Sequence, residues 1–440
     1  MMLPGAEISI VCAKVTPRIQ FIAGYLTSVT GMNFAVARSA DPIDPPESKP
    51  SCVIHYGDQP MPGAFNIFAS GLMAETGIKA FKPEVFKHGD QTMIFPAPDG
   101  FELPFDLFSA VFLLLSRYEE YLPFKADRHG RFEASESLAY RCRFLDEPVV
   151  DQWIEMLKKA LVERFQGLQF PEQKFRQVAT FDVDNPWAYL HKGRIRSAAG
   201  LVKQMLCLNM REVRLRISVL RGITPDPFDR YAYIRTILKD RGMPVLFFFL
   251  SGNYGRYDTN YALRSGSFKE LIENLRPDCI LGIHPSYRSN RDENLLHSEF
   301  AFYSGLLGKR PELSRQHFLL LSFPETYRRL IKQGITSDYS MGYAGHTGFR
   351  AGTSRPFRFY DLKEELETGL LLHPFEVMDV TLQQYMRLNP PEALQTIEKL
   401  VNRIKAVNGI FTSLWHNESL SETGEWKGWT EVFEKMIRMG

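Results

Sequence analysis

Alternating β and α segments from residue 173 onward constrain the fold of this chain more than any other feature. Short runs rich in apolar, β-branched and aromatic residues are separated by polar turns and by segments with helical spacing. We expect strands at residues 178–182, 245–250, 279–284, 317–321, 334–339, 370–375 and 409–415, and helices at 268–275, 299–306, 324–332 and 391–407. Such alternation predicts an α/β fold with a parallel sheet covered by helices, and about seven strands suit a distorted (β/α) barrel.

A smaller α/β segment precedes the expected barrel. A polar turn at residues 167–173 separates an amphipathic helix at 149–165 from the first barrel strand. The clearest element upstream is a strongly apolar helix expected at 104–121. We therefore divide the chain into an N-terminal α/β domain of unknown role, residues 1–170, and a barrel, residues 173–440.

The composition is that of an ordinary globular protein, and the charge balance argues neither for nor against nucleic acid, a partner that we do not expect. The 440 residues are 44% hydrophobic and 24% charged, and the formal net charge is +2. Five scattered cysteines give neither a zinc-knuckle spacing nor a disulfide framework. We find no secretory signal and no apolar run of membrane-spanning length. These features predict a cytoplasmic protein.

One basic segment, at about residues 192–222, interrupts the alternation. It carries eight Lys or Arg residues against one acid, Glu212, with apolar residues interleaved. A basic amphipathic helix suits an anionic membrane surface or a polyanionic partner. The interpretation that we favour is a helix packed on the barrel with a solvated basic face; peripheral membrane contact is the alternative.

Two carboxylates mark the end of the first barrel strand. Asp182 and Asp184 lie one residue apart, and Asn185-Pro186 follows, which prevents the strand from continuing in mid-sheet. Active sites of α/β folds lie at the carboxyl ends of their strands. One carboxylate could bind a metal while the other accepts a proton, although a solvated turn would have a similar sequence.

Polar residues recur at the ends of the later strands. Asp184, His284 and one further histidine would form the three-ligand, open-position site of a catalytic zinc-type ion. Asp182 would then take a proton from water, and His416 would protonate the leaving group. The candidates for substrate binding are the other polar or aromatic residues of these strand ends, namely Tyr287, Arg315, Asp338, Arg350, Trp415 and Asn417.

These motifs resemble the polysaccharide deacetylase superfamily of the carbohydrate esterase family 4 type. The resemblance covers residues 173–440 and lies in the Thr-Phe-Asp-x-Asp strand, the strand end with His284, the Arg315-Gln316-His317 strand start and the final Leu-Trp-His-Asn. That superfamily uses a distorted (β/α) barrel and a divalent metal to remove N- or O-acetyl groups from sugars. The resemblance implies a base at Asp182, a metal ligand at Asp184 and an acid at His416. The upstream segment is similar to an uncharacterised domain that precedes a divergent subgroup.

The second motif of that superfamily, a His-x-x-x-His pair, is incomplete here. His284 fills its first position, but Arg288 stands at the second. We expect His317 to supply the third ligand, with His191 or His346 as alternatives, or a degenerate site without metal. The implied cofactor is a divalent ion, zinc first, with cobalt, nickel or manganese as alternatives.

The sequence therefore predicts a metal-dependent hydrolase that removes an acyl group, N-acetyl first, from a sugar or polysaccharide. Such an enzyme would cleave carbon–nitrogen bonds other than peptide bonds. Two alternatives stay open. One is a degenerate glycan-binding barrel without metal, and the other is a metal-dependent amidohydrolase or esterase with a non-glycan substrate.

Overall fold

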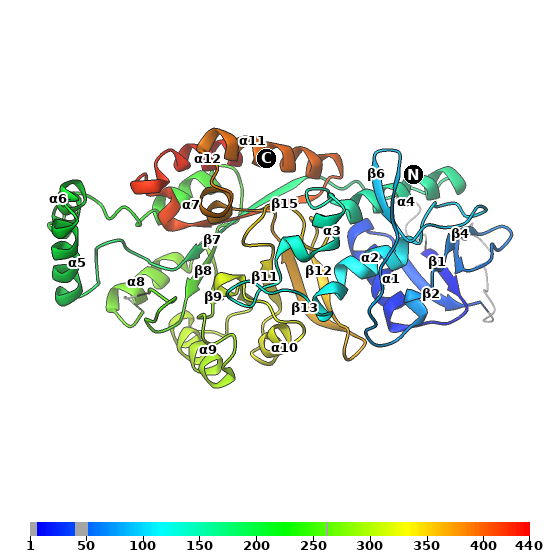
Figure 1. Ribbon diagram of the computed structural model, residues 1–440, viewed down its shortest axis with the longest axis horizontal. Coiled ribbons are helices and arrows are strands. Elements are labelled where there is room, and N and C mark those ends of the chain that lie inside the picture. Colours follow the sequence, from blue (N-terminus) through cyan, green and yellow to red (C-terminus); the bar gives the residue numbers. More distant parts are fainter. Residues whose placement is uncertain (1–6, 40–51, 261–262) are drawn as a thin grey trace.

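A four-stranded parallel sheet forms the N-terminal part of the molecule. The computed structural model describes residues 7–39, 52–260 and 263–440 (Figure 1). The sheet has the order β2-β1-β3-β4 and consists of β1 (Glu7–Cys12), β2 (Asn33–Arg38), β3 (Cys52–Gly57) and β4 (Phe65–Phe68). Helix α1 (Pro17–Thr30) connects β1 to β2; the Thr16 hydroxyl caps its start, and Gly31, in the left-handed region, ends it. A hairpin, β5 (Val85–His88) and β6 (Gln91–Ile94), lies nearby.

The remainder of the chain builds a mixed sheet of nine strands that curls into a partial barrel. Its order is β12-β13-β11-β10-β9-β8-β7-β15-β14. The strands are β7 (Arg176–Val183), β8 (Leu246–Leu250), β9 (Ile280–His284), β10 (Leu313–Ser314), β11 (Ser337–Met341), β12 (Phe357–Asp361), β13 (Leu366–Pro374), β14 (Val377–Met378) and β15 (Ile410–His416). All pairs are parallel except β12 with β13.

The two residues between β13 and β14 show how the sheet curls. These strands lie toward opposite ends of the sheet order, yet only Phe375 and Glu376 separate them. The Phe375 amide donates to the Met341 carbonyl at 3.2 Å, and the Glu376 amide donates to the Thr412 carbonyl at 3.1 Å. This short crossing can join both sides only because the sheet bends round on itself.

Helices cover the barrel largely where the sequence predicts them. The expected segments correspond to α4 (Val149–Arg164), α8 (Gly266–Leu275), α9 (Glu293–Leu307), α10 (Glu325–Lys332) and α11 (Pro390–Ala406), and α7 (Tyr231–Lys239) and α12 (Trp429–Ile437) are added. The basic segment forms two helices, α5 (Arg194–Leu206) and α6 (Met210–Leu220), instead of one. In the part of the chain that the structure describes, no helix combines the length and apolar character needed to cross a membrane.

The structure differs from two of the expected elements, because one or two residues in each adopt a left-handed backbone conformation. Residues 317–321 do not form a strand: Phe318 and Leu319 have φ values of 60° and 54°, and the strand is instead β10, just upstream. The apolar helix α2 covers only Leu107–Leu115, because Arg117, with φ 53°, interrupts it before a 3₁₀ turn at Tyr118–Tyr121. The sheet also has nine strands instead of about seven, since β12 and β14 are not evident in the sequence.

The N-terminal sheet and the barrel share one apolar core. The Tyr360 ring of β12 lies 5.1 Å from the rings of both Phe21 in α1 and Phe112 in α2. The same apolar cluster includes Trp153 of α4 and Phe181 of β7, which flank the expected boundary near residue 170. The N-terminal sheet precedes the predicted boundary and the barrel sheet follows it, but the apolar core continues across that boundary.

A buried ion pair fastens the two parts together. The Arg350 guanidinium of the barrel donates to the Glu120 carboxylate, with its Nε 2.9 Å from Oε1. Arg117 donates to the same carboxylate at 2.8 Å, and all three side chains are buried. Because the positive charges of both arginines outweigh the effect of burial, the pKa of Glu120 is lowered.

We predict that Glu120→Ala strongly destabilises the protein, because it leaves Arg350 without its buried counter-ion. The expected loss is about 3–5 kcal/mol of unfolding free energy. Urea denaturation followed by circular dichroism measures it, and Glu163→Ala, at an exposed glutamate of α4, is the matched control with little effect. A small loss for Glu120→Ala would show that the pair does not fasten the two parts.

Candidate metal centre

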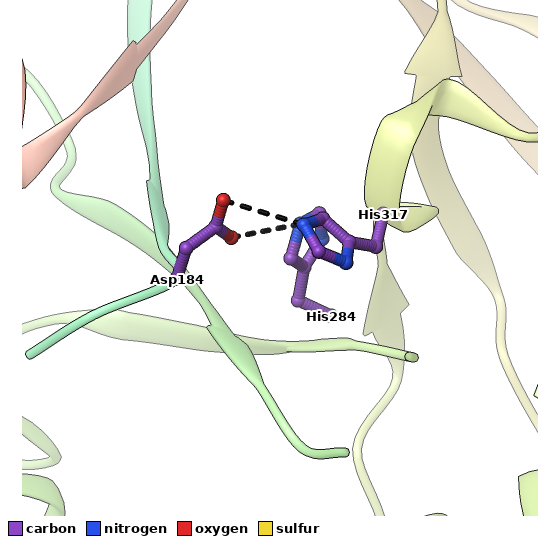
Figure 2. Close-up of side chains that lie close together, drawn as sticks. All are labelled: Asp184, His284 and His317. Carbon is purple, nitrogen blue, oxygen red and sulfur yellow. Dashed lines mark ion pairs between the residues drawn. The ribbon is translucent and has the colours of Figure 1, made fainter. Parts of the chain in front are cut away.

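Three side chains meet at the carboxyl edge of the barrel sheet (Figure 2). Asp184 follows β7, His284 ends β9 and His317 follows β10. The Nε2 atom of His284 lies 3.4 Å from Oδ1 of Asp184, and the Nε2 atom of His317 lies 3.3 Å from Oδ2. All three ligand atoms lie within 4.8 Å of one another. A tetrahedral ion with bonds of about 2.0–2.2 Å needs ligands at this kind of spacing.

The Nδ1 atoms of His284 and His317 each have a hydrogen-bond partner, which fixes the orientation of both rings. Nδ1 of His284 lies 2.7 Å from the Arg315 carbonyl, so this nitrogen donates. Nδ1 of His317 lies 2.9 Å from Oδ1 of Asp258, which also receives the Tyr287 amide at 2.8 Å. In the neutral form, protonated at Nδ1, both histidines would present an Nε2 lone pair toward Asp184, as metal-ligating histidines do. Without a metal, burial would lower the pKa of His317, but the Asp184 and Asp258 carboxylates outweigh it and raise that pKa to about 9, so a metal would have to displace the Nε2 proton.

The third candidate ligand, Asp184, is ionised, and one of its oxygens has no hydrogen-bond partner. Burial alone would raise its pKa, but the neighbouring imidazoles of His317 and His284 hold the pKa well below its usual value. Its Oδ1 atom is buried and has no hydrogen-bond partner. A carboxylate whose two oxygens each face one imidazole nitrogen, and whose Oδ1 has no donor, fits a cation. These three residues could hold a divalent metal, and two nitrogens with one oxygen are a ligand set that zinc accepts.

Asp182 lies beside the cluster and is oriented by a buried arginine. Its Oδ2 atom is 3.7 Å from Nε2 of His284, while Oδ1 accepts from Nη1 of Arg315 at 3.1 Å. Arg315 also donates to the Thr180 hydroxyl at 2.8 Å and to the Tyr339 carbonyl at 3.0 Å, and its side chain is fully buried. Arg315 therefore positions Asp182 from within the barrel.

His416 faces the cluster from the neighbouring strand. It is the register partner of Asp182, because β15 runs parallel to β7. Its Nδ1 lies 2.9 Å from Oδ1 of Asp379, a fully buried carboxylate that also accepts the His416 amide and the Ser419 hydroxyl. Burial would lower the pKa of His416, but the Asp379 carboxylate outweighs it and, with Asp184 and Asp182, raises the pKa to about 10. The imidazole is therefore protonated at neutral pH, and Nδ1 is engaged.

Three of the six expected substrate-binding residues lie near this centre. Besides Arg315, Asn417 donates to the carbonyls of Asn185 and Phe228 and so holds the loop after Asp184. Tyr287 lies on the rim, where its ring is 4.4 Å from that of Tyr257.

The other three make structural contacts with the rest of the chain. Arg350 pairs with Glu120. Asp338 is buried, accepts from the hydroxyls of Ser314 and Ser340, and has its pKa raised to about 6 by burial. Trp415 is fully buried against Trp429 and Phe433 and offers no face to a ligand.

The alternative third ligands do not join the cluster. The His191 ring packs against Trp187 at 4.4 Å, and the His346 ring packs against Tyr140 at 5.2 Å. Arg288, which replaces the second motif histidine, is exposed. Among the residues that the structure describes, the cluster consists of Asp184, His284 and His317.

Sequence reasoning missed the groups that support the centre. Asp258 lies in a polar stretch after β8 and carries no motif. Glu418 lies two residues after His416 in the sequence; burial raises its pKa to about 7, against the opposing effect of the His416 charge. The N-terminal part also contributes, because Arg131 donates to the Phe318 carbonyl at 2.9 Å, directly after the candidate ligand His317. The dense charge of residues 125–131 is a signal that could have indicated this contact.

Comparison with known proteins gives one family match and several weak similarities to solved structures. Residues 8–166 match a family of unknown function, DUF7033. A candidate polysaccharide deacetylase from Mycobacterium smegmatis is 14% identical, with a TM-score of 0.40 over 62% of this chain and 85% of that one. The polysaccharide deacetylase Bc1974 from Bacillus cereus is 12% identical, with a TM-score of 0.29 over 61% and 88%. No curated protein matches the chain.

We predict that near-stoichiometric zinc binds the wild-type protein and is lost in Asp184→Ala, His284→Ala and His317→Ala. Each substitution removes one of three ligands. Elemental analysis after zinc reconstitution and desalting measures the content. The matched controls are His191→Ala and His346→Ala, which should retain zinc. Zinc that survives the loss of His317 but not of one control histidine would move the third ligand to that control position.

We also predict that Asp258→Asn weakens zinc binding by about 10–100-fold without abolishing it. The substitution removes the carboxylate that orients His317 but leaves all three ligands in place. Competition with a chromophoric chelator measures the affinity. An unchanged affinity would mean that Asp258 does not support the centre.

Proposed function

We propose that this chain is a metal-dependent hydrolase that removes an acyl group, N-acetyl foremost, from a sugar or polysaccharide. One observation carries the proposal: a positioned carboxylate and a positioned imidazolium lie on adjacent strands beside a three-ligand cluster. Asp182 and His416 are register partners on β7 and β15, and Asp184 follows Asp182 by two residues. Hydrolysis of an amide needs this pairing, because a proton must leave water and another must reach the departing amine.

Asp182 would act as the base. Its Oδ1 atom is held by Arg315, and Oδ2 lies on the side of His284 and the cluster. A divalent cation, zinc foremost, bound by Asp184, His284 and His317 would polarise the acyl carbonyl and lower the pKa of water toward about 7. The same three residues could bind cobalt, nickel or manganese instead. The carboxylate can accept the proton of that water without moving, because Arg315 fixes its orientation.

His416 would act as the acid. Asp379 engages its Nδ1 atom, which leaves Nε2 to carry the proton that the leaving group needs. The raised pKa keeps the imidazole charged near neutral pH, so a proton is available when the carbon–nitrogen bond breaks. After the reaction, the neutral imidazole regains its charge readily because the Asp379 carboxylate favours the cation.

Aromatic side chains at the rim support a sugar as the substrate. Tyr257, Tyr287 and Phe318 form a cluster next to His317, with ring centroids 4.4–5.4 Å apart. His129 of the N-terminal part packs against all three. Aromatic side chains offer flat apolar faces, and the tyrosines add a polar edge, so a pyranose ring can stack on them. We place the sugar against this cluster, which the N-terminal part helps to build.

We predict that Asp182→Asn and His416→Ala each lower kcat at least about 100-fold while zinc stays bound. Release of acetate from N-acetylated oligosaccharides measures the rate, and elemental analysis checks the metal. Arg288→Ala, at an exposed position near the centre, is the control and should stay within a few-fold of wild type. Bound zinc with no acetate release from any acetylated sugar would favour a non-glycan amidohydrolase or esterase. A wild-type protein that binds no zinc would favour a glycan-binding barrel.

The pH dependence should report the Asp379–His416 pair. His416 must be protonated to act, so activity falls as the pH rises above its pKa. Asp379 raises that pKa, and Asp379→Asn should therefore lower it and move the alkaline limb of the kcat profile to lower pH. An alkaline limb that does not move would contradict the assignment of His416 as the acid.

A further inference from the structure

The two-helix segment α5–α6 exposes far more apolar surface than the rest of the chain. Among the described residues, sixteen large hydrophobic side chains are exposed, and eight of them lie between residues 195 and 223. They are Ile195, Val202, Met205, Leu206, Leu208, Met210, Leu220 and Ile223. Helix α5 has no buried residue at all. A helix without a fully buried residue that exposes large aliphatic side chains is suited to binding something else.

The same segment concentrates positive charge. Residues 192–221 carry eight Lys or Arg residues and one acid, whereas the whole chain has a formal net charge of only +2. Arg194, Lys203, Arg211 and Arg214 are all exposed. The charge is therefore local and would attract an anionic surface or molecule.

Four of these eight residues, Met205, Leu206, Leu208 and Met210, lie at the tip of this helical hairpin. Leu206 and Leu208, at the connection between α5 and α6, are 79% and 83% exposed. Lys203 and Arg211 lie on either side of this connection in the sequence. Figure 1 shows α5 and α6 projecting from the body at the end opposite the N-terminal sheet, on the side where β7 ends.

We propose that the α5–α6 hairpin docks on an anionic lipid bilayer. An apolar tip flanked by basic residues can insert among acyl chains while the cations contact lipid phosphates. Nucleic acid or an acidic protein would use the charge but leave the leucine tip in water. A second copy of the hairpin is disfavoured, because both surfaces carry the same strong positive charge.

Docking would tether the candidate metal centre to the membrane surface. Asp184 lies ten residues before the start of α5 at Arg194, which is at most about 35 Å of extended chain, and α5 adds about 20 Å to the hairpin tip. This consequence, unlike the docking itself, rests on the proposed function: the substrate would be an acylated sugar attached to a lipid, presented at the bilayer surface.

The test is co-sedimentation of the full chain with vesicles of phosphatidylcholine alone or mixed with phosphatidylglycerol. We expect binding to the anionic vesicles only, weakened by added salt. The triple substitution Arg194→Glu, Arg211→Glu and Arg214→Glu should reduce partitioning at least about 100-fold, since each basic residue near an anionic surface contributes about fivefold. Leu206→Ser with Leu208→Ser should reduce it at least about tenfold.

Controls separate docking from catalysis and from loss of folding. Lys174→Glu, Lys309→Glu and Lys427→Glu together change the net charge equally at exposed positions outside the hairpin and should leave binding unchanged. Asp184→Ala should bind vesicles like the wild type, so failure of the proposed chemistry would leave the docking result intact. Circular dichroism checks that each variant is folded. Equal binding by the triple variant, or binding to an oligonucleotide but not to anionic vesicles, would overturn the proposal.

Discussion

The candidate centre depends on the hydrogen bonds that the buried guanidinium of Arg315 donates. Its side chain joins Asp182 and Thr180 of β7 to the Tyr339 carbonyl of β11, and its own carbonyl accepts from His284. One residue therefore orients the proposed base and one proposed ligand together. A fully buried arginine is costly unless its charge and donors are matched. Asp182 provides that match, so the stability of this part of the barrel and the geometry of the centre have the same origin.

The N-terminal part takes part in this arrangement instead of standing apart. The Glu120–Arg350 pair and the shared apolar core hold it against the barrel. Farther along, Arg131 binds the Phe318 carbonyl, and His129 joins the aromatic cluster at the rim. The backbone of Phe318 is left-handed directly after the proposed ligand His317, and a contact from the N-terminal part stabilises this unusual turn. The N-terminal part thus supports a ligand position that the sequence of the barrel would not fix by itself.

Local patterns predicted much of this structure, and long-range contacts account for the remainder. Strand-ending Asp182 and Asp184 and the helix α4 follow from short stretches of sequence. The assembly of Asp184, His284 and His317 was predictable because parallel strands bring their carboxyl ends to one edge. Arg350, in contrast, reads as a polar strand-end residue, and only Glu120, 230 residues away in the sequence, reveals its structural contact. Asp258 and the short strand β14 have no periodic pattern, and their roles are visible only once distant strands meet.

X-ray absorption spectroscopy of the zinc-loaded protein tests the central claim most directly, because it reports the ligands of the ion itself. The account predicts a first shell of nitrogen and oxygen at about 2.0–2.2 Å with the outer-shell scattering of two imidazoles. Replacing His317 with alanine should reduce that scattering to one imidazole or release the zinc. A spectrum of zinc without imidazole ligands, or one that His317→Ala leaves unchanged, would contradict the three-residue centre.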